Sequence, residues 1–151
     1  MTPTVRIQRE DFSVAEEVAA LSRGRPGVGA VATFTGLCRD EGGRLAALEL
    51  EHYPGMAEAE VLRVAGEAAR RWPLDGVTVI HRFGRIRPGE NIVLVAAASS
   101  HRRAAFAAAE FLMDFLKTRA PFWKREHLAD GTVGDWVEAR GEDDEAAERW
   151  G

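Results

Sequence analysis

Cysteine and long apolar runs are nearly absent from this chain. The 151 residues include one cysteine, Cys38, which cannot form an internal disulfide, so a reducing compartment fits best. No apolar run approaches the roughly 20 residues that a membrane-spanning helix needs. The first ten residues also lack the apolar core of a signal peptide. The sequence therefore predicts a cytoplasmic protein with no membrane partner.

Motifs for nucleotides and metals are missing as well. The chain contains no GxxxxGK[ST], GxGxxG, CxxC or HExxH pattern, which leaves nucleotide, dinucleotide and metalloprotease functions without support. A net charge of -4 argues against generic nucleic-acid binding. The four histidines lack zinc-like spacing, so we expect no metal and no cofactor; they are His52, His81, His101 and His127.

Lysine is scarce as well. Of the 20 basic residues, the two lysines are Lys117 and Lys124, and both lie in the run DFLKTRAPFWKRE, residues 114–126. An arginine stays charged, whereas a lysine ammonium can lose its proton when desolvated and then act as a base or nucleophile. Both lysines are therefore candidates for chemistry. The alternative is that an arginine-rich composition left two surface lysines by chance.

Hydrophobic patterning predicts one α+β domain over residues 1–151, since domains of roughly 100 to 150 residues are common. A capping box at Ser13 begins a helix that ends before Gly24. A second helix covers residues 56–72, and a third begins near Ser99 or Ser100 and ends shortly after Lys117. Its expected core face is Phe106, Ala109, Leu112, Met113 and Leu116. The expected strands are residues 5–8, 29–35, 45–53, 77–83, 92–98, 122–126 and 132–139, and the second and third of them could form a hairpin.

Two places could bind an anion. The segment SSHRR, residues 99–103, puts two hydroxyls, a histidine and two arginines at a helix N-terminus, where free amides favour a phosphate. Ordinary serine capping with exposed arginines is an equal alternative. Arg39, after the strand ending in FTG, could clamp a phosphate or carboxylate with its fork of donors.

The lysine run could form a third site. Pro121 turns the chain between a helix and a strand, which could bring Lys117 and Lys124 to one pocket. Phe122 and Trp123 would desolvate that pocket and favour a neutral amine. We interpret Cys38, in an apolar segment, as a small packing residue rather than a reactive thiolate.

The C-terminal half of the sequence consists of a basic segment followed by an acidic one. Residues 102–125 hold six basic and two acidic side chains, a net +4, which could attract a small anion or an acidic partner. Residues 126–151 hold nine acids and two arginines, a net -7.

Several segments together resemble one family, the large, catalytic subunit of molybdopterin synthase. They are VATFTG followed by Arg39, LELEHYPGM, RRWPL, VIHRFG, SSHR and FLKTRAPFWKRE, and the resemblance runs from about residue 12 to residue 150. It implies an α/β hammerhead-type fold with an additional antiparallel β-sheet. It also implies a homodimer flanked by two small ubiquitin-like sulfur-carrier subunits, forming a heterotetramer.

The activity that the resemblance implies is sulfur transfer. The C-terminal glycine thiocarboxylate of the carrier would enter the pocket and supply sulfur to cyclic pyranopterin monophosphate, and two transfers would build the dithiolene of molybdopterin. Lys117 would be the principal catalytic residue and Lys124 a second one. Arg39, His101 and Arg102 would hold the substrate phosphate. The other substrate-binding positions would be Phe34, Leu37, Cys38, Arg125 and Glu126.

One departure from the family is visible between Gly36 and Arg39. Leu37 and Cys38 stand where relatives commonly carry a polar or basic residue and then a small apolar one. Side-chain contacts from Leu37 to the substrate are therefore doubtful, although backbone contacts could persist.

Two other functions remain open on the residues alone. One is a noncatalytic module whose basic pocket docks an acidic protein tail. The other is a phosphate-ester lyase or hydrolase that acts without a partner. A further hypothesis concerns the acidic tail, which ends in Trp150 and Gly151 and could enter the basic pocket when no carrier is bound; a solvated helix is the alternative.

Overall fold

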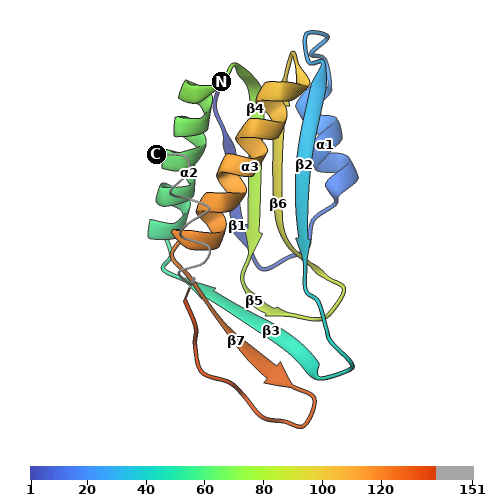
Figure 1. The fold of residues 1–151 in the computed structure, drawn as a ribbon, viewed down its shortest axis with the longest axis vertical. Helices are drawn as coiled ribbons and strands as arrows, with labels where there is room; N and C mark the ends of the chain where they lie inside the picture. The colour runs from blue at the N-terminus through green and yellow to red at the C-terminus, as the bar shows by residue number, and fades with distance from the viewer. Residues whose placement is uncertain (139–151) are drawn as a thin grey trace.

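The computed structural model describes residues 1–138 (Figure 1). The acidic tail, and with it the hypothesis that the tail enters the pocket, lies outside the described residues. No helix within residues 1–138 is both long and apolar enough to cross a membrane. The elements in chain order are β1 (Thr4–Gln8), α1 (Val14–Ser22), β2 (Ala30–Leu37), β3 (Leu45–His52), α2 (Met56–Arg71), β4 (Leu74–Arg82), β5 (Gly84–Ile86), β6 (Asn91–Ser99), α3 (Arg102–Thr118) and β7 (Phe122–Leu128).

The main sheet has four strands in the order β1-β4-β6-β2. β1 runs parallel to β4, and the other pairs are antiparallel. The central strands β4 and β6 are almost wholly buried, because α2 and α3 cover one face of the sheet and α1 packs on the other (Figure 1). Residues that are buried on both faces of a sheet produce the nearly unbroken apolar run that predicted β6.

The larger core lies between this sheet and the two long helices. The stripe predicted for α2, which includes Val61, Val64 and Ala68, packs there against alternate residues of β4 and β6. α2 ends at Arg71, directly before Trp72 and Pro73, as the sequence predicted. Trp72 packs edge to face against Phe111 of α3, with ring centroids 5.4 Å apart.

The predicted face of α3 is partly wrong. Phe106 is 65% exposed, whereas Phe111 and Phe115 are buried together with small alanines of the first turns. The start of the helix also differs from the prediction. Ser99 still pairs within β6 and its hydroxyl donates to the carbonyl of Pro73 at 2.8 Å, so α3 begins only at Arg102.

The second sheet has three strands in the order β5-β3-β7 and lies at one end of the main sheet (Figure 1). The predicted hairpin of residues 29–35 and 45–53 is therefore wrong, because β2 pairs with β6 whereas β3 pairs with β5 and β7. Strand β5 was not predicted. The predicted strand 132–139 is reduced to two isolated bridges, at Val133 and Val137, and its last residue lies outside the described residues.

Candidate active site

A cavity of about 460 Å³ opens where α3 and the two sheets meet. Lys117 reaches it from the last turn of α3 and Lys124 from β7. Pro121 lies in the short turn between these elements, so the prediction that it brings both lysines to one pocket is confirmed. The apolar part of the wall comes from β2, β3 and α3 and includes Phe34, Leu48, Leu50, Met113 and Leu116.

A row of neighbouring residues across three strands lies against the cavity. Gly36 of β2 pairs with Val93 of β6, and Val93 pairs in turn with His81 of β4. A Cβ atom on Gly36 would lie 2.7 Å from the side chain of Val93, closer than real Cβ atoms come to a neighbour. Glycine at this position therefore leaves room for Val93.

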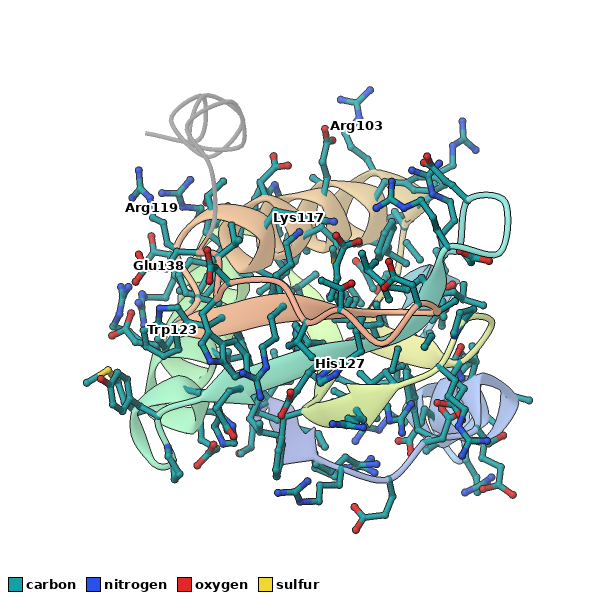
Figure 2. All side chains as sticks on the ribbon, turned by 90° about the horizontal axis from the view of Figure 1, so that it is seen from below. Arg103, Lys117, Arg119, Trp123, His127 and Glu138 are labelled. Atoms are coloured by element: carbon teal, nitrogen blue, oxygen red, sulfur yellow. The ribbon has the colours of Figure 1, made fainter. Side chains whose placement is uncertain are left out.

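The two lysines are exposed, so the desolvation expected from Phe122 and Trp123 is not present in the chain as described. Both aromatic residues line the cavity, but they leave it open. Figure 2 shows Lys117 between α3 and β7, whereas Arg103 points outward from α3. A cavity of this kind can bind the anionic end of an extended ligand, which would itself exclude water from the amines.

Residues after β7 complete one side of the cavity. Lys124 and Val137 exchange two backbone hydrogen bonds, of 3.0 and 2.7 Å, which hold this segment beside β7. The indole nitrogen of Trp123 donates to Glu138 at 2.6 Å. Val137 and Glu138 both line the cavity. Sequence reasoning placed them in a strand and gave them no role, because nothing local to them shows that the chain folds back over Lys124.

His81 is a cavity residue to which sequence reasoning gave no role. It is 7% exposed, lines the cavity, and stacks on Phe122 with ring centroids 3.9 Å apart. Burial lowers the pKa of His81 to about 4; the hydrogen bond to the Arg82 carbonyl acts in the opposite direction, and the neighbouring His52 and Lys117 add to the lowering. One signal was available: in β4, His81 follows the buried Val77 and Val79 at alternate positions and so shares their face.

Arg125 and Glu126 do not line the cavity. Arg125 lies opposite Glu49 of β3 and donates to its carboxylate at 2.8 Å, and His127 donates to the same oxygen at 2.7 Å. These hydrogen bonds, that from His127 first, lower the pKa of Glu49. The Arg125 guanidinium also lies 4.4 Å from the ring centre of Trp136. Its charge is therefore already paired within the protein.

The residues after Gly36 also differ in whether they line the cavity. Leu37 is exposed and lines the cavity. Cys38 is 3% exposed and its thiol points to the carbonyl of Ile86 at 3.6 Å. Burial raises the pKa of this thiol, so the interpretation of Cys38 as a packing residue is confirmed. Arg39 is exposed, pairs with Glu41 at 2.7 Å, and does not line the cavity.

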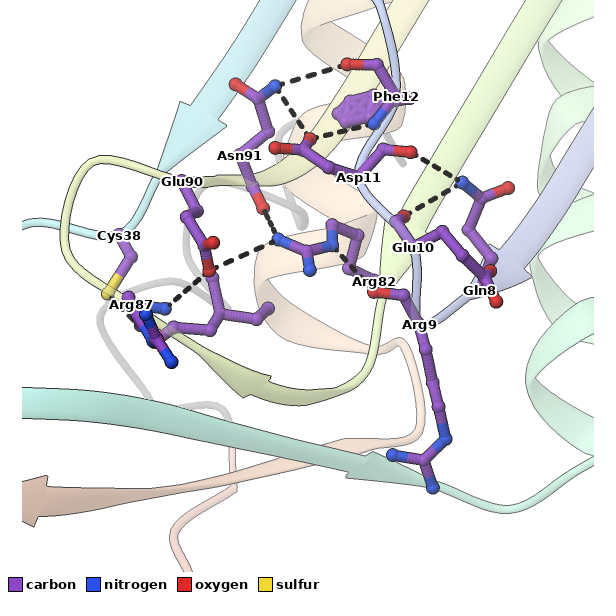
Figure 3. A network of polar contacts seen from close by, with 11 residues as sticks. Gln8, Arg9, Glu10, Asp11, Phe12, Cys38, Arg82, Arg87, Glu90 and Asn91 are labelled. Carbon is purple, nitrogen blue, oxygen red and sulfur yellow. Dashed lines mark hydrogen bonds and ion pairs between the residues drawn. The ribbon is translucent and has the colours of Figure 1, made fainter.

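A buried arginine holds this segment in place (Figure 3). Arg82 donates to the carbonyls of Arg9 and Asn91, each at 2.9 Å, and its guanidinium lies 3.8 Å from the carboxylate of Glu90. The backbone carbonyl of Glu90 then accepts from the amide of Cys38 at 2.8 Å. These bonds fix the course of the chain between Gly36 and Arg39.

His101 and Arg102 lie at the other end of α3, where they line a separate hollow with Arg103 and Phe106. Gly29 packs closely beneath this end, since a Cβ atom there would lie 2.1 Å from the carbonyl oxygen of Ser100. Fifteen residues of helix separate Arg102 from Lys117, or roughly 22 Å at 1.5 Å per residue. Within one chain, the predicted phosphate site and the lysine cavity are therefore apart.

A family model described as "MoaE protein" matches residues 7–119, three quarters of the chain. The chain belongs to the MoaE protein family.

Individual MoaE relatives match almost the whole chain. The molybdopterin synthase catalytic subunit of Mesorhizobium japonicum is 70% identical over 150 residues, which cover 99% of this chain and 94% of that relative. The solved MoaE protein of Burkholderia ambifaria is 52% identical with a TM-score of 0.84, covering 98% of this chain and 97% of the other. The molybdopterin synthase structure from Staphylococcus aureus is 29% identical with a TM-score of 0.79, covering 88% and 96%.

These matches confirm the family and the activity that the resemblance implied. As a MoaE protein, the chain is a catalytic subunit of molybdopterin synthase, an enzyme of molybdenum cofactor biosynthesis that transfers sulfur. The mixed fold of helices and two sheets is likewise confirmed. Among residues 1–138 no three His, Cys, Asp or Glu side chains gather closely enough to hold a metal ion.

Proposed function

We propose that the lysine cavity is where the thiocarboxylate of a small ubiquitin-like carrier meets cyclic pyranopterin monophosphate. Lys117 is the principal catalytic residue and Lys124 the second. One observation carries the proposal: the chain's two lysines, one on the helix before Pro121 and one on the strand after it, line the same cavity. An unbranched glycine terminus is the kind of chain end that fits a cavity with an apolar wall and two cations.

The chemistry requires cations at this point. When the thiocarboxylate sulfur attacks the substrate, negative charge develops on the displaced oxygen, and fixed positive groups stabilise it most effectively where the ligand excludes water. Lys117 acts as a general acid toward the leaving oxygen or orients the terminal carboxyl of the carrier. Phe34 and Leu37, both lining the cavity, shape the path of the chain end.

The phosphate anchor is the second part of the proposal. Arg39, His101 and Arg102 hold the substrate phosphate, although within one chain His101 and Arg102 lie roughly 22 Å from Lys117 along α3. A single pterin cannot bridge that distance, so we place these residues across a homodimer, where a second copy completes the site. Cys38, Arg125 and Glu126 then support the site indirectly. The thiol of Cys38 donates to the backbone carbonyl of Ile86. Arg125 pairs with Glu49, and Glu126 pairs with Arg44.

Assembly and location follow from the same reasoning. A homodimer with one carrier at each cavity is a heterotetramer. The similarity to the molybdopterin synthase of Staphylococcus aureus supports a shared activity. We place the protein in the cytoplasm, in agreement with its single cysteine, which is free and buried.

The test is molybdopterin formation from cyclic pyranopterin monophosphate with purified chain and thiocarboxylated carrier. Lys117→Ala should abolish product, whereas Arg119→Ala should retain it, because Arg119 is a nearby exposed cation that does not line the cavity. Equal product from Lys117→Ala would move catalysis elsewhere. Carrier binding without product from the wild type would favour the docking module, and turnover without carrier would favour the lyase or hydrolase.

Mixed dimers test the placement of the phosphate anchor. Lys117→Ala and Arg102→Ala chains should each be inactive, yet their mixture should recover up to about a quarter of wild-type activity, because half of the dimers are mixed and each has one intact site. No recovery after verified subunit exchange would contradict a site shared between copies.

A further inference from the structure

The protonation of His81 is fixed by its surroundings. Its Nδ1 lies 2.8 Å from the backbone carbonyl oxygen of Arg82. A carbonyl oxygen can only accept, so Nδ1 carries the proton and the opposite nitrogen, Nε2, keeps its lone pair. The ring cannot turn freely, because it is buried and stacked on Phe122 with an interplanar angle of 17°.

That lone pair belongs to a residue of the cavity. His81 lines the same space as Lys117 and Lys124, at the end of the row that Gly36 and Val93 begin. Within residues 1–138, Nε2 of His81 makes no hydrogen bond, and it is not fully enclosed, because the buried side-chain atom without a partner there is Nδ1 of His52. A ring nitrogen that reaches a cavity and has no partner in the protein is a position that a ligand or water can use.

Sulfur transfer from a thiocarboxylate creates a need for a base. Once its sulfur has formed the new C–S bond, the carrier remains attached as an acyl thioester. Release requires a water molecule to attack the acyl carbon: the C–O bond forms, the acyl C–S bond breaks, and the electron pair of that bond goes to sulfur. The water proton must go to a base near the acyl carbon. This step rests on the proposed function above.

We propose that His81 is a third catalytic residue, whose Nε2 takes the proton from the water that cleaves the acyl thioester. The imidazolium then returns this proton to the newly formed thiolate, so His81 ends each transfer neutral. The products are the substrate with one thiol and the carrier with a C-terminal carboxylic acid, which ionises to a carboxylate by releasing the second water proton to solvent. Each of the two sulfur transfers that build the dithiolene requires this hydrolysis once.

The other polar groups of the cavity suit this task less well. A lysine ammonium has no lone pair to offer. The carboxylate of Glu138 already accepts the indole hydrogen of Trp123. Burial keeps His81 neutral at neutral pH by lowering its pKa to about 4, and Lys117 from α3 and His52 from β3 act in the same direction. The anionic end of a bound carrier would oppose the charge of Lys117 and make Nε2 more basic when it is needed.

The experiment is a single turnover of the complete enzyme with thiocarboxylated carrier and cyclic pyranopterin monophosphate. The reaction is quenched, and the mass of the carrier is measured by mass spectrometry. His81→Asn keeps an amide donor for the carbonyl of Arg82 but removes Nε2. It should accumulate carrier joined to substrate by a hydroxylamine-sensitive thioester, with acyl release roughly a hundredfold slower. Glu138→Gln, which retains an acceptor for Trp123, is the matched control and should not accumulate this adduct. His81→Gln, which places an amide near Nε2 that cannot take a proton, is the second variant if His81→Asn folds poorly.

Each outcome decides between the alternatives. Accumulation in His81→Asn or His81→Gln, with normal formation of the first C–S bond, supports the proposal. Wild-type release rates in both variants, or loss of C–S bond formation without adduct, would overturn it and leave His81 a structural residue. Accumulation in Glu138→Gln would assign the base to that carboxylate instead. No product from the wild type with a competent carrier would overturn the proposed function, and this inference with it.

Discussion

Acid should destabilise this protein through His81 in a way that can be measured apart from catalysis. The buried ring has a pKa of about 4 in the folded chain, against about 6.5 for an ordinary histidine. Above pH 6.5 neither the folded nor the unfolded chain protonates it, so it has no effect on stability. Between pH 6.5 and 4 the unfolded chain binds a proton at this histidine and the folded chain does not, which favours unfolding.

The size of the effect follows from these values. Each pH unit between them contributes about 1.4 kcal/mol, so at pH 4.5 His81 should lower the free energy of unfolding by about 2.5 kcal/mol relative to pH 7. Below pH 4 both states carry the proton and the loss levels off. The paired carboxylate of Glu49 also loses stabilisation as the pH falls, because its pKa is lowered in the folded chain.

A variant without the titratable ring separates the two contributions. His81→Asn should be less stable than the wild type at pH 7, because it leaves space under Phe122, but its stability should fall less on acidification. Urea unfolding of both proteins at pH 7 and 4.5, at one protein concentration, gives the comparison. The wild type should lose about 2.5 kcal/mol more than the variant, since the loss from Glu49 is common to both. Equal losses would refute the idea that burial keeps His81 neutral.

Other substitutions test the site and its supports. Gly36→Ala should push Val93 aside, destabilise the fold by about 1 to 3 kcal/mol and raise the KM for the carrier, as thermal unfolding and steady-state kinetics would show. Glu49→Gln should lower the free energy of unfolding at pH 7 by about 1 to 2 kcal/mol in urea unfolding, since it weakens two charge-assisted hydrogen bonds. Lys117→Arg should reduce kcat at least a hundredfold with little change in carrier Kd if the amine acts as an acid; near-normal turnover would leave only an electrostatic role. Cys38→Ser should stay active in the synthase assay, because its buried thiol does not line the cavity.

The features that the sequence predicted well are those with local causes. Pro73 and Pro121 end helices at α2 and α3, because a proline cannot continue the hydrogen-bonding pattern. The apolar stripe of α2 and the apolar run of β6 reflect burial along a single element. The convergence of Lys117 and Lys124 was also local in origin, since one short turn joins the helix and strand that bear them.

The incorrect predictions concern contacts between distant segments. A polar turn around residues 40–44 would suit a hairpin, but the preceding strand finds a more apolar partner in β6, far along the chain, and β3 crosses to the other sheet. In α3 the largest apolar side chain of the first turns, Phe106, was wrongly assigned to the core face, whereas Ala109 and Leu112 of that face are buried. Alanines such as Ala105 and Ala108 face the sheet instead, because small residues let the helix approach it closely.

The site residues also include some that the sequence predicted correctly and some that it did not, and strand geometry explains the difference. Lys124 and Arg125 are neighbours in sequence and both basic, so composition treats them alike. Successive residues of a strand point to opposite faces, however, and pairing with β3 puts Lys124 opposite Leu50 of the cavity wall and Arg125 opposite Glu49. The carboxylate then neutralises the arginine, while the lysine stays available to a ligand. His81 was overlooked for the converse reason: its strand reads as core, and only the arrival of α3 and Phe122 above that face turns a core position into part of a cavity. The exposure of Lys124 and the position of His81 therefore both depend on the register between strands, which no single segment of the sequence contains.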